Sequence, residues 1–125
     1  MNHTDLAVIV FAHGSRDPLW RAPVEAVAAR IAQRAPGSFV ACAYLELCTP
    51  DLPEAVAQAL ATGVRRVRVL PLFFGMGKHA REDLPALVAS LRAAHPDVVF
   101  ELMRPAGEND RLTSLLADMA LEDAA

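Results

Sequence analysis

Two histidines and one carboxylate stand where apolar segments of the chain give way to polar ones. His13 directly follows the apolar run Leu6–Ala12, and Glu46 ends the run Phe39–Glu46. His79 comes after a third such run, beyond two glycines. Imidazole nitrogens bind Fe, Co, Ni, Cu and Zn alike, and histidine also exchanges protons near neutral pH. The three residues are therefore candidates for a metal site or for acid–base chemistry.

Cationic and hydroxyl side chains lie close to these candidates in the sequence. The polar residues expected to bind a ligand there are Ser15, Arg16, Lys78, Arg81 and Arg104. Guanidinium and ammonium groups bind carboxylates and phosphates, so they predict a local anion site. The net charge of −3 argues against a general nucleic-acid binder, which usually has a basic face. Cations, apolar neighbours and a possible metal site together fit a flat polycarboxylate that takes up a metal.

Four apolar runs are predicted as β-strands that bring these residues together. They are Leu6–Ala12, Phe39–Glu46, Val67–Phe74 and Val98–Met103. Continuous apolar character without polar alternation is typical of parallel strands buried on both faces. The composition, 54% apolar, suits such a sheet and leaves room for an apolar contact between two copies.

Four helical patterns alternate with the predicted strands. The first helix has an apolar stripe of Val24, Val27, Ala28 and Ile31, with Pro23 near its first turn, and the second lies between Asp51 and Gly63. The third has the stripe Leu84, Leu87, Val88 and Leu91. The fourth has the stripe Leu112, Leu115, Leu116 and Met119, after a cap at Asn109 or Asp110. Alternating strands and helices imply right-handed crossovers. We therefore predict an α/β fold: one domain over residues 1–125, a doubly wound, four-stranded parallel sheet with helices on both faces.

The order of strands in the predicted sheet indicates where a ligand would bind. Open parallel sheets bind ligands beyond the carboxyl ends of the strands, where the strand order reverses. In a flavodoxin-like order, 2-1-3-4, this point lies between the first and third strands. Those strands lead into the glycine-containing loops with His13 and His79. We therefore expect both histidines and Glu46 to converge in one cleft.

The remaining candidates for chemistry have simpler interpretations. Cys42 and Cys48 match no zinc or redox motif, and Cys42 is expected to be a small core residue. His3 and His95 are expected to be solvated. The N-terminal stretch has no basic region before its apolar run, and no segment is long enough to span a bilayer. A cytoplasmic protein without a signal peptide is expected.

Three motifs resemble one protein family in the same order along the chain. "HGSRDP" (His13–Pro18), "YLELCTPDLPEA" (Tyr44–Ala55) and "VLPLFFGMGKHAREDLP" (Val69–Pro85) resemble the CbiX family of sirohydrochlorin chelatases, and the similarity extends from about Leu6 to about Pro105. The length resembles the short form of the family, which forms homodimers. The resemblance implies insertion of a divalent metal, most often cobalt for cobalamin and in relatives iron or nickel, into sirohydrochlorin. The metal is then a substrate, and no organic cofactor is implied.

The same resemblance implies roles for individual residues. The metal-site histidines of the family fall on His13 and His79, and its acidic residue falls on Glu46. Ala12 stands where the family often has glycine, and Lys78 directly precedes the second histidine. Neutral imidazoles would hold the metal and pass it to the ring nitrogens, while a histidine or Glu46 would accept the pyrrolic protons. The basic residues would hold the carboxylates of the macrocycle.

Other functions remain open at the level of the sequence. A metal-binding or metal-delivery protein without chelatase activity would use the same histidines. Phosphoryl transfer through His13 is a weaker alternative, because Ala12 stands where such enzymes carry an arginine. A nucleotide-binding protein would need a glycine-rich phosphate loop, which the sequence lacks. The identity of the metal also stays open, because affinities for imidazole follow the Irving–Williams order whatever the biology.

Overall fold

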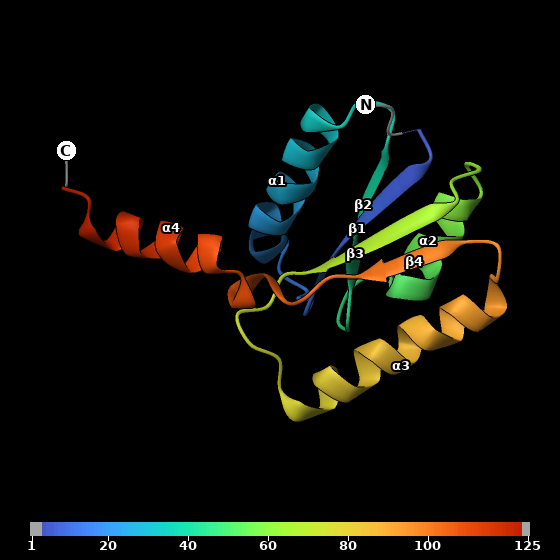
Figure 1. Ribbon diagram of the computed structural model, residues 1–125. Coiled ribbons are helices and arrows are strands. Elements are labelled where there is room, and N and C mark those ends of the chain that lie inside the picture. Colours follow the sequence, from blue (N-terminus) through green and yellow to red (C-terminus); the bar gives the residue numbers. More distant parts are fainter. Residues whose placement is uncertain (1–3, 124–125) are drawn as a thin grey trace.

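The computed structural model describes residues 4–123, which form a four-stranded sheet and its helices (Figure 1). The elements in chain order are β1 (Leu6–Ala12), α1 (Pro18–Arg34), β2 (Phe39–Tyr44), α2 (Leu52–Leu60), β3 (Arg66–Pro71), α3 (Lys78–Ala94), β4 (Val99–Leu102), the 3₁₀ helix η1 (Ala106–Glu108) and α4 (Asp110–Leu121). All neighbouring strands are parallel, in the order β2-β1-β3-β4. The predicted fold class and strand order are confirmed.

Short polar side chains start three of the four helices, as N-caps do. The carboxylate of Asp17 accepts a hydrogen bond from the amide of Leu19 before α1. Asp51 caps α2 in the same way through the amide of Glu54, at 2.9 Å. Asn109 caps α4 by accepting from the amide of Arg111. The starts predicted at Asp51 and Asn109 are therefore confirmed.

Some predicted element boundaries are wrong by a few residues. β2 ends at Tyr44, before Glu46, because the amide of Tyr44 bonds the carbonyl of Pro50 across a tight loop. β3 ends at Pro71, and Phe74, predicted to close the strand, is 72% exposed. Pro23 lies inside α1 rather than in its first turn, because the helix already begins at Pro18.

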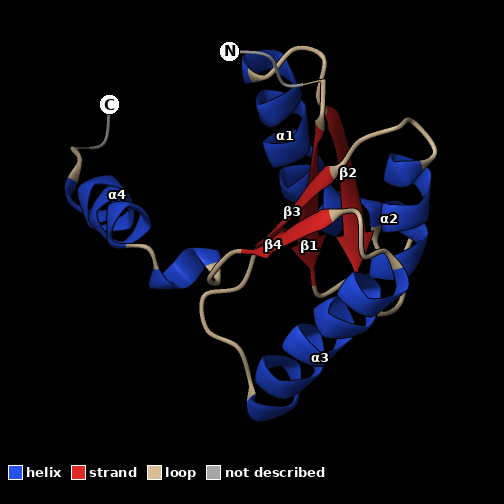
Figure 2. Cartoon of the chain, turned by 45° about the vertical axis from the view of Figure 1, so that its right-hand side comes forward, coloured by secondary structure: helices blue, strands red, loops and turns tan. Residues whose placement is uncertain are grey.

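Helices cover the two faces of the sheet unequally. α2 and α3 pack on one face and α1 on the other (Figure 2). The core under α2 and α3 includes the fully buried side chains Ile9, Leu52, Val56, Val67, Val69 and Val88. On the other face, Val24 of α1 packs with Val10, Ala12 and Tyr44, which belong to β1 and β2. Within residues 4–123, that second layer leaves β3 and β4 without a helix above them.

The helix α4 does not cover this gap. It leaves the body of the molecule and points away from the sheet (Figure 1). None of its residues is buried, and Leu115 and Met119 are 53% and 54% exposed. The amphipathic pattern correctly predicts a helix, but its apolar stripe is not buried within the described chain.

Two further expectations concern membranes and thiols. No helix among residues 4–123 is both long enough and apolar enough to cross a bilayer. Cys42 and Cys48 are free and partly buried. Cys42 packs beside the core under α1, as expected of a small core residue. His3 lies outside the described residues.

Candidate active site at the carboxyl edge of the sheet

His13 and Glu46 form a direct pair just beyond β1 and β2. The Nε2 atom of His13 lies 3.0 Å from Oε1 of Glu46. The backbone supports the pair, because the amide of Glu46 donates to the carbonyl of His13 at 3.0 Å and the amide of Leu45 donates to that of Ala12 at 2.9 Å. Both paired side chains are 56% exposed. An imidazole and a carboxylate therefore meet at an edge that a large ligand can reach.

Gly14 allows the two loops of this pair to touch. Its φ of +108° lies in the region that favours glycine. A Cβ atom at this position would lie 1.8 Å from the carbonyl oxygen of Glu46, far inside van der Waals contact. The sequence interpretation did not single out Gly14, although its place directly after His13 was the available signal. It positions the histidine–carboxylate pair.

Ser15 has a structural role in the same loop. Its hydroxyl oxygen accepts a hydrogen bond from the amide of Asp17 at 3.0 Å. Its carbonyl accepts from the guanidinium of Arg21, also at 3.0 Å, a contact that the sequence interpretation missed. The Ser15 hydroxyl proton stays available to a ligand. Arg16, beside it, is exposed.

The first turn of α3 contains Lys78, His79 and Arg81. The sequence had suggested that these residues lie in a loop, and that expectation is wrong. Gly77 is the N-cap, and it supplies no side-chain hydrogen bond to the helix amides. The first turn has no acidic residue. Among the described residues neither cation forms an ion pair. Cations at the positive end of a helix dipole disfavour the helix and favour a bound anion.

The two histidines and Glu46, expected to meet in one cleft, do not form one group of side chains. Within residues 4–123, no group of three His, Cys, Asp or Glu side chains could hold a metal ion. The physical reason is the connection 72–77, which carries the start of α3 away from the sheet (Figures 1 and 2). The structure therefore brings together His13 and Glu46, and it leaves His79 on a separate, exposed helix start.

The connection after β3 is fixed by the turn that follows β4. The amide of Gly107 donates to the carbonyl of Phe73 at 2.8 Å. A Cβ at Gly107 would lie 2.1 Å from the carbonyl oxygen of Phe74, so the two backbones touch. Gly107 was not singled out from the sequence either, because the contact joins segments far apart in the chain.

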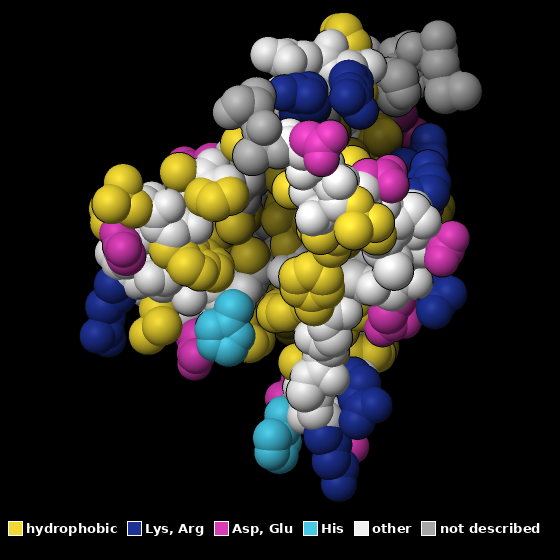
Figure 3. All heavy atoms as spheres, turned by 90° about the vertical axis from the view of Figure 1, so that its left-hand side faces the viewer, with side chains coloured by type: hydrophobic (Ala, Val, Ile, Leu, Met, Phe, Trp, Pro, Cys, Tyr) yellow, Lys and Arg dark blue, Asp and Glu magenta, His cyan; other side chains and the backbone are white. Residues whose placement is uncertain are grey.

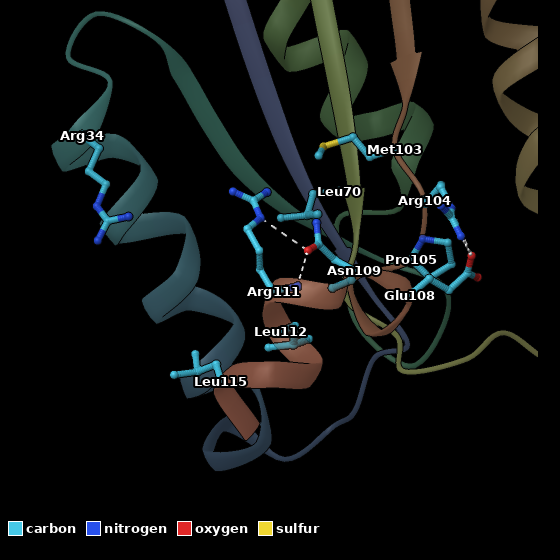
Figure 4. Close-up of a pocket in the computed structure, with 11 residues that line it drawn as sticks. Arg34, Leu70, Met103, Arg104, Pro105, Glu108, Asn109, Arg111, Leu112 and Leu115 are labelled. Carbon is cyan, nitrogen blue, oxygen red and sulfur yellow. Dashed lines mark hydrogen bonds and ion pairs between the residues drawn. The ribbon is translucent and has the colours of Figure 1, made fainter. Parts of the chain in front are cut away.

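Arg104, expected at the anion site, already has an acidic partner. Its guanidinium donates to Glu108 Oε1 through Nη2 at 3.1 Å and through Nε at 3.3 Å. The pair lines a hollow of about 820 Å³ between α1 and α4 (Figure 4). Neither His13 nor His79 lines this hollow. Of the predicted site residues, only Arg104 does.

Two side chains of β2, Cys42 and Tyr44, are poor nucleophiles. Burial raises the pKa of Tyr44 to about 12, and the adjacent Cys42 adds to the effect. Burial also raises the pKa of the Cys42 thiol. Both groups are therefore protonated at neutral pH. The histidine–carboxylate pair and the cations are therefore the candidates for chemistry at this edge.

The fold and this edge define a class: a small parallel α/β protein with an exposed histidine–carboxylate pair beyond its central strands. A family model identifies it further, because the CbiX model matches residues 7–123. The chain belongs to the CbiX family.

Several relatives of this chain carry the same name. The sirohydrochlorin cobaltochelatase of Methanopyrus kandleri is 35% identical over 83 residues, which span 66% of this chain and 58% of that protein. The sirohydrochlorin cobaltochelatase of Methanococcoides burtonii is 26% identical over 125 residues, with 94% and 95% of the two chains covered. The similarity to the first of these thus spans less than two thirds of that relative.

Solved structures of similar proteins share the fold. A CbiX protein from Marinobacter aquaeolei VT8 has a TM-score of 0.79 and 36% identity, covering 92% of this chain and 93% of that one. The sirohydrochlorin chelatase SirB from Bacillus subtilis subspecies spizizenii, in complex with cobalt, has a TM-score of 0.75 at 21% identity. The match covers 93% of this chain and 50% of SirB, so this chain spans about half the length of that chelatase.

Proposed function

We propose that this protein is a sirohydrochlorin chelatase, which inserts a divalent metal, in the first place Co²⁺, into the macrocycle. The observation that carries the proposal is the His13–Glu46 pair, 3.0 Å apart at the exposed carboxyl edge. Membership of the CbiX family and the names of its relatives support it. The metal is a substrate in this reaction, Fe²⁺ and Ni²⁺ are alternatives to Co²⁺, and no organic cofactor is needed.

The pair supplies the two operations that metal insertion requires. A neutral imidazole has one donor and one acceptor nitrogen. With Nε2 of His13 donating to Glu46, the Nδ1 atom keeps its lone pair for the metal, and the carboxylate makes the imidazole a better ligand. The macrocycle must lose its inner protons as the metal enters, and Glu46, the carboxylate beside His13, would accept them. Few protein ligands and an open coordination sphere favour release of the metal to the ring.

His79 supplies the second imidazole from the start of α3. Because the three side chains do not form one group in the described chain, the macrocycle would span the distance between the His13–Glu46 pair and α3. Lys78 and Arg81 beside His79, and Arg16 near His13, would hold its carboxylates. Ser15 would donate its hydroxyl proton, and Arg104 would exchange Glu108 for a substrate carboxylate.

A homodimer in the cytoplasm is the proposed working form. The match to half of the SirB chain supports it, because two copies of this chain have about the length of that chelatase. The two free thiols, Cys42 and Cys48, fit a reducing compartment. The product would serve cobalamin biosynthesis.

An anaerobic insertion assay tests the activity. Sirohydrochlorin is mixed with Co²⁺, Fe²⁺ or Ni²⁺, and absorbance follows the metallated product with and without the protein. We expect a rate well above the uncatalysed reaction, fastest with the physiological metal. Metal binding without faster insertion of any of the three metals would contradict the proposal and indicate a metal-delivery protein.

A further inference from the structure

The backbone of Leu47, the residue after Glu46, has a conformation that leucine rarely adopts. Its φ is +70°, and within residues 4–123 no other residue except glycine has a positive φ. The Cβ atom makes this left-handed region unfavourable, whereas glycine adopts it freely and asparagine tolerates it. Leucine at this position therefore destabilises the loop relative to either of those residues.

The side chain of Leu47 does not offset this strain by packing in the core. Leu47 is 49% exposed, and neither cluster of buried side chains in the described chain includes it. Its neighbour Cys48, in contrast, packs against the cluster under α1. Strained residues that the surrounding structure holds in place are concentrated at sites that bind ligands. An exposed apolar side chain on a strained backbone therefore indicates a contact with a ligand.

The loop that contains Leu47 is fixed at both of its ends. Before Leu47, the amide of Glu46 donates to the carbonyl of His13 at 3.0 Å. After Leu47, the carbonyl of Pro50 accepts from the amide of Tyr44 at 2.9 Å. These hydrogen bonds hold the left-handed conformation in place, directly beside the histidine–carboxylate pair.

On the other side of Glu46, Leu45 adds apolar surface toward α3. Its side chain lines a small apolar hollow together with Met76, from the connection after β3, and Ala80, from the first turn of α3. Ala80 directly follows His79 in the sequence. An apolar surface therefore extends from the loop after β2 toward the helix that carries the second histidine.

Further exposed apolar side chains belong to the same edge of the sheet. They are Leu19 and Trp20 at the start of α1 and Phe74 in the connection after β3. In Figure 3, hydrophobic side chains lie beside a histidine in the lower half of the view. Apolar side chains gathered around a few polar groups are typical of a site that binds a small molecule.

We propose that Leu47 packs against a face of the macrocycle and positions the ring beside the His13–Glu46 pair. The macrocycle has carboxylates around its rim and apolar faces. The cations proposed above hold the rim, and an apolar side chain is the matching partner for a face. Because Leu47 directly follows Glu46, this contact sets how closely the ring nitrogens approach the imidazole of His13. The inference rests on the proposed function and adds a residue that positions its substrate.

Substitutions that suit the backbone but lack the apolar side chain test this role. Leu47→Asn should raise the melting temperature by about 3 °C, because the strain is relieved, and Leu47→Gly should not lower it. Metal-free sirohydrochlorin is titrated anaerobically without added metal, and its absorbance gives the dissociation constant. We expect this constant to rise about 10-fold in both variants, because the exposed half of Leu47 is no longer buried against the ring. Leu47→Met should stay within about 3-fold of the natural protein.

Val99→Asn is the control for the loss of an exposed apolar side chain. Val99 is 56% exposed at the start of β4, which lies at the opposite edge of the parallel sheet. The dissociation constant for sirohydrochlorin should therefore not change in this variant. An unchanged constant in Leu47→Asn, or a lower melting temperature in both Leu47→Asn and Leu47→Gly, would overturn the proposal.

Insertion assays on the same proteins separate this inference from the proposed function. Fast insertion by the natural protein, with equal sirohydrochlorin binding by every variant, would refute the role of Leu47 and leave the chelatase proposal intact. Weaker binding by Leu47→Asn and Leu47→Gly, without faster insertion of any metal by the natural protein, would refute the chelatase and keep Leu47 as a macrocycle contact. A natural protein that binds no sirohydrochlorin would contradict both.

Discussion

The side chains of His13 and Glu46 lie 3.0 Å apart, and the same two residues are joined again through their backbones. This double link follows from the register of the sheet, in which Ala12 of β1 is paired with Tyr44 of β2. The carboxylate is thus held beside the imidazole by the strands themselves. Because the backbone holds the two side chains together, Glu46 can orient the imidazole of His13, accept its proton or do both.

Glu46→Gln should separate the charge of this residue from its shape. The amide can still accept a hydrogen bond from His13, but it neither takes up a proton nor strengthens the imidazole as a ligand. We expect the turnover of metal insertion to fall by roughly 100-fold, the lower range for loss of a general base. Insertion assays would measure this, with Glu25→Gln on the exposed surface of α1 as the control. Equal rates for both variants would rule out Glu46 as the base.

Gly14→Ala should disturb the pair without removing either partner. The new methyl group would meet the carbonyl of Glu46 at 1.8 Å, so the loop has to move. Gly63 is a matched control, because its φ is also positive, at +92°, but no atom lies within 4 Å of its Cβ position. We expect Gly63→Ala to cost about 1 kcal/mol from strain alone. In denaturant unfolding, Gly14→Ala should cost clearly more, and it alone should lose insertion activity.

Removing cations from the start of α3 should weaken function and strengthen the fold. Lys78 and Arg81 stand at the positive end of the helix, where each is unfavourable by about 0.3–1 kcal/mol. Lys78→Gln with Arg81→Gln should therefore raise the melting temperature while it raises KM for sirohydrochlorin.

The control for these cations is Arg92, in the last turn of the same helix. Its guanidinium donates to the carbonyl of Phe100 at 2.9 Å, so Arg92→Gln should lower the melting temperature and leave KM unchanged. An unchanged KM in the double variant at α3's start would contradict the proposed anion site.

Acid should weaken the fold through Glu101. A hydrogen bond from Arg68, at 2.8 Å, lowers the pKa of this carboxyl below its usual 4.5. A group whose pKa is lower in the folded state stabilises the fold above its unfolded pKa and loses that effect as pH falls through the folded one. Free energies of unfolding measured below pH 4.5 should thus fall less steeply for Glu101→Gln. The effect is small because water screens this partly exposed pair, and Arg68→Gln should reproduce it.

Much of the fold was predictable because burial on both faces leaves a plain signal. β1 was predicted to the residue, since all seven of its side chains are buried. The ends of β2 and β3 were not, because apolar residues such as Leu45 and Phe74 continue past the sheet into exposed loops. The apolar stripe of α4 predicted a helix, but periodicity does not reveal whether that stripe packs against the sheet.

The site was predictable in part for a similar reason. His13 and Glu46 follow neighbouring strands, so the strand order alone predicts that they meet. His79 follows a connection whose path depends on the backbone contact between Gly107 and Phe74, which no local pattern records. Lys78 and Arg81 were recognised as site candidates, but their place on a helix start depended on Gly77 serving as the cap.

The most direct test of the central claim is the rate of Co²⁺ insertion into sirohydrochlorin by a variant that combines His13→Ala and His79→Ala. His95→Ala, at the far end of α3, is the matched control. Our account predicts that the double variant falls to the uncatalysed rate while the control keeps the natural rate. Full activity in the double variant would contradict the proposal that these imidazoles deliver the metal.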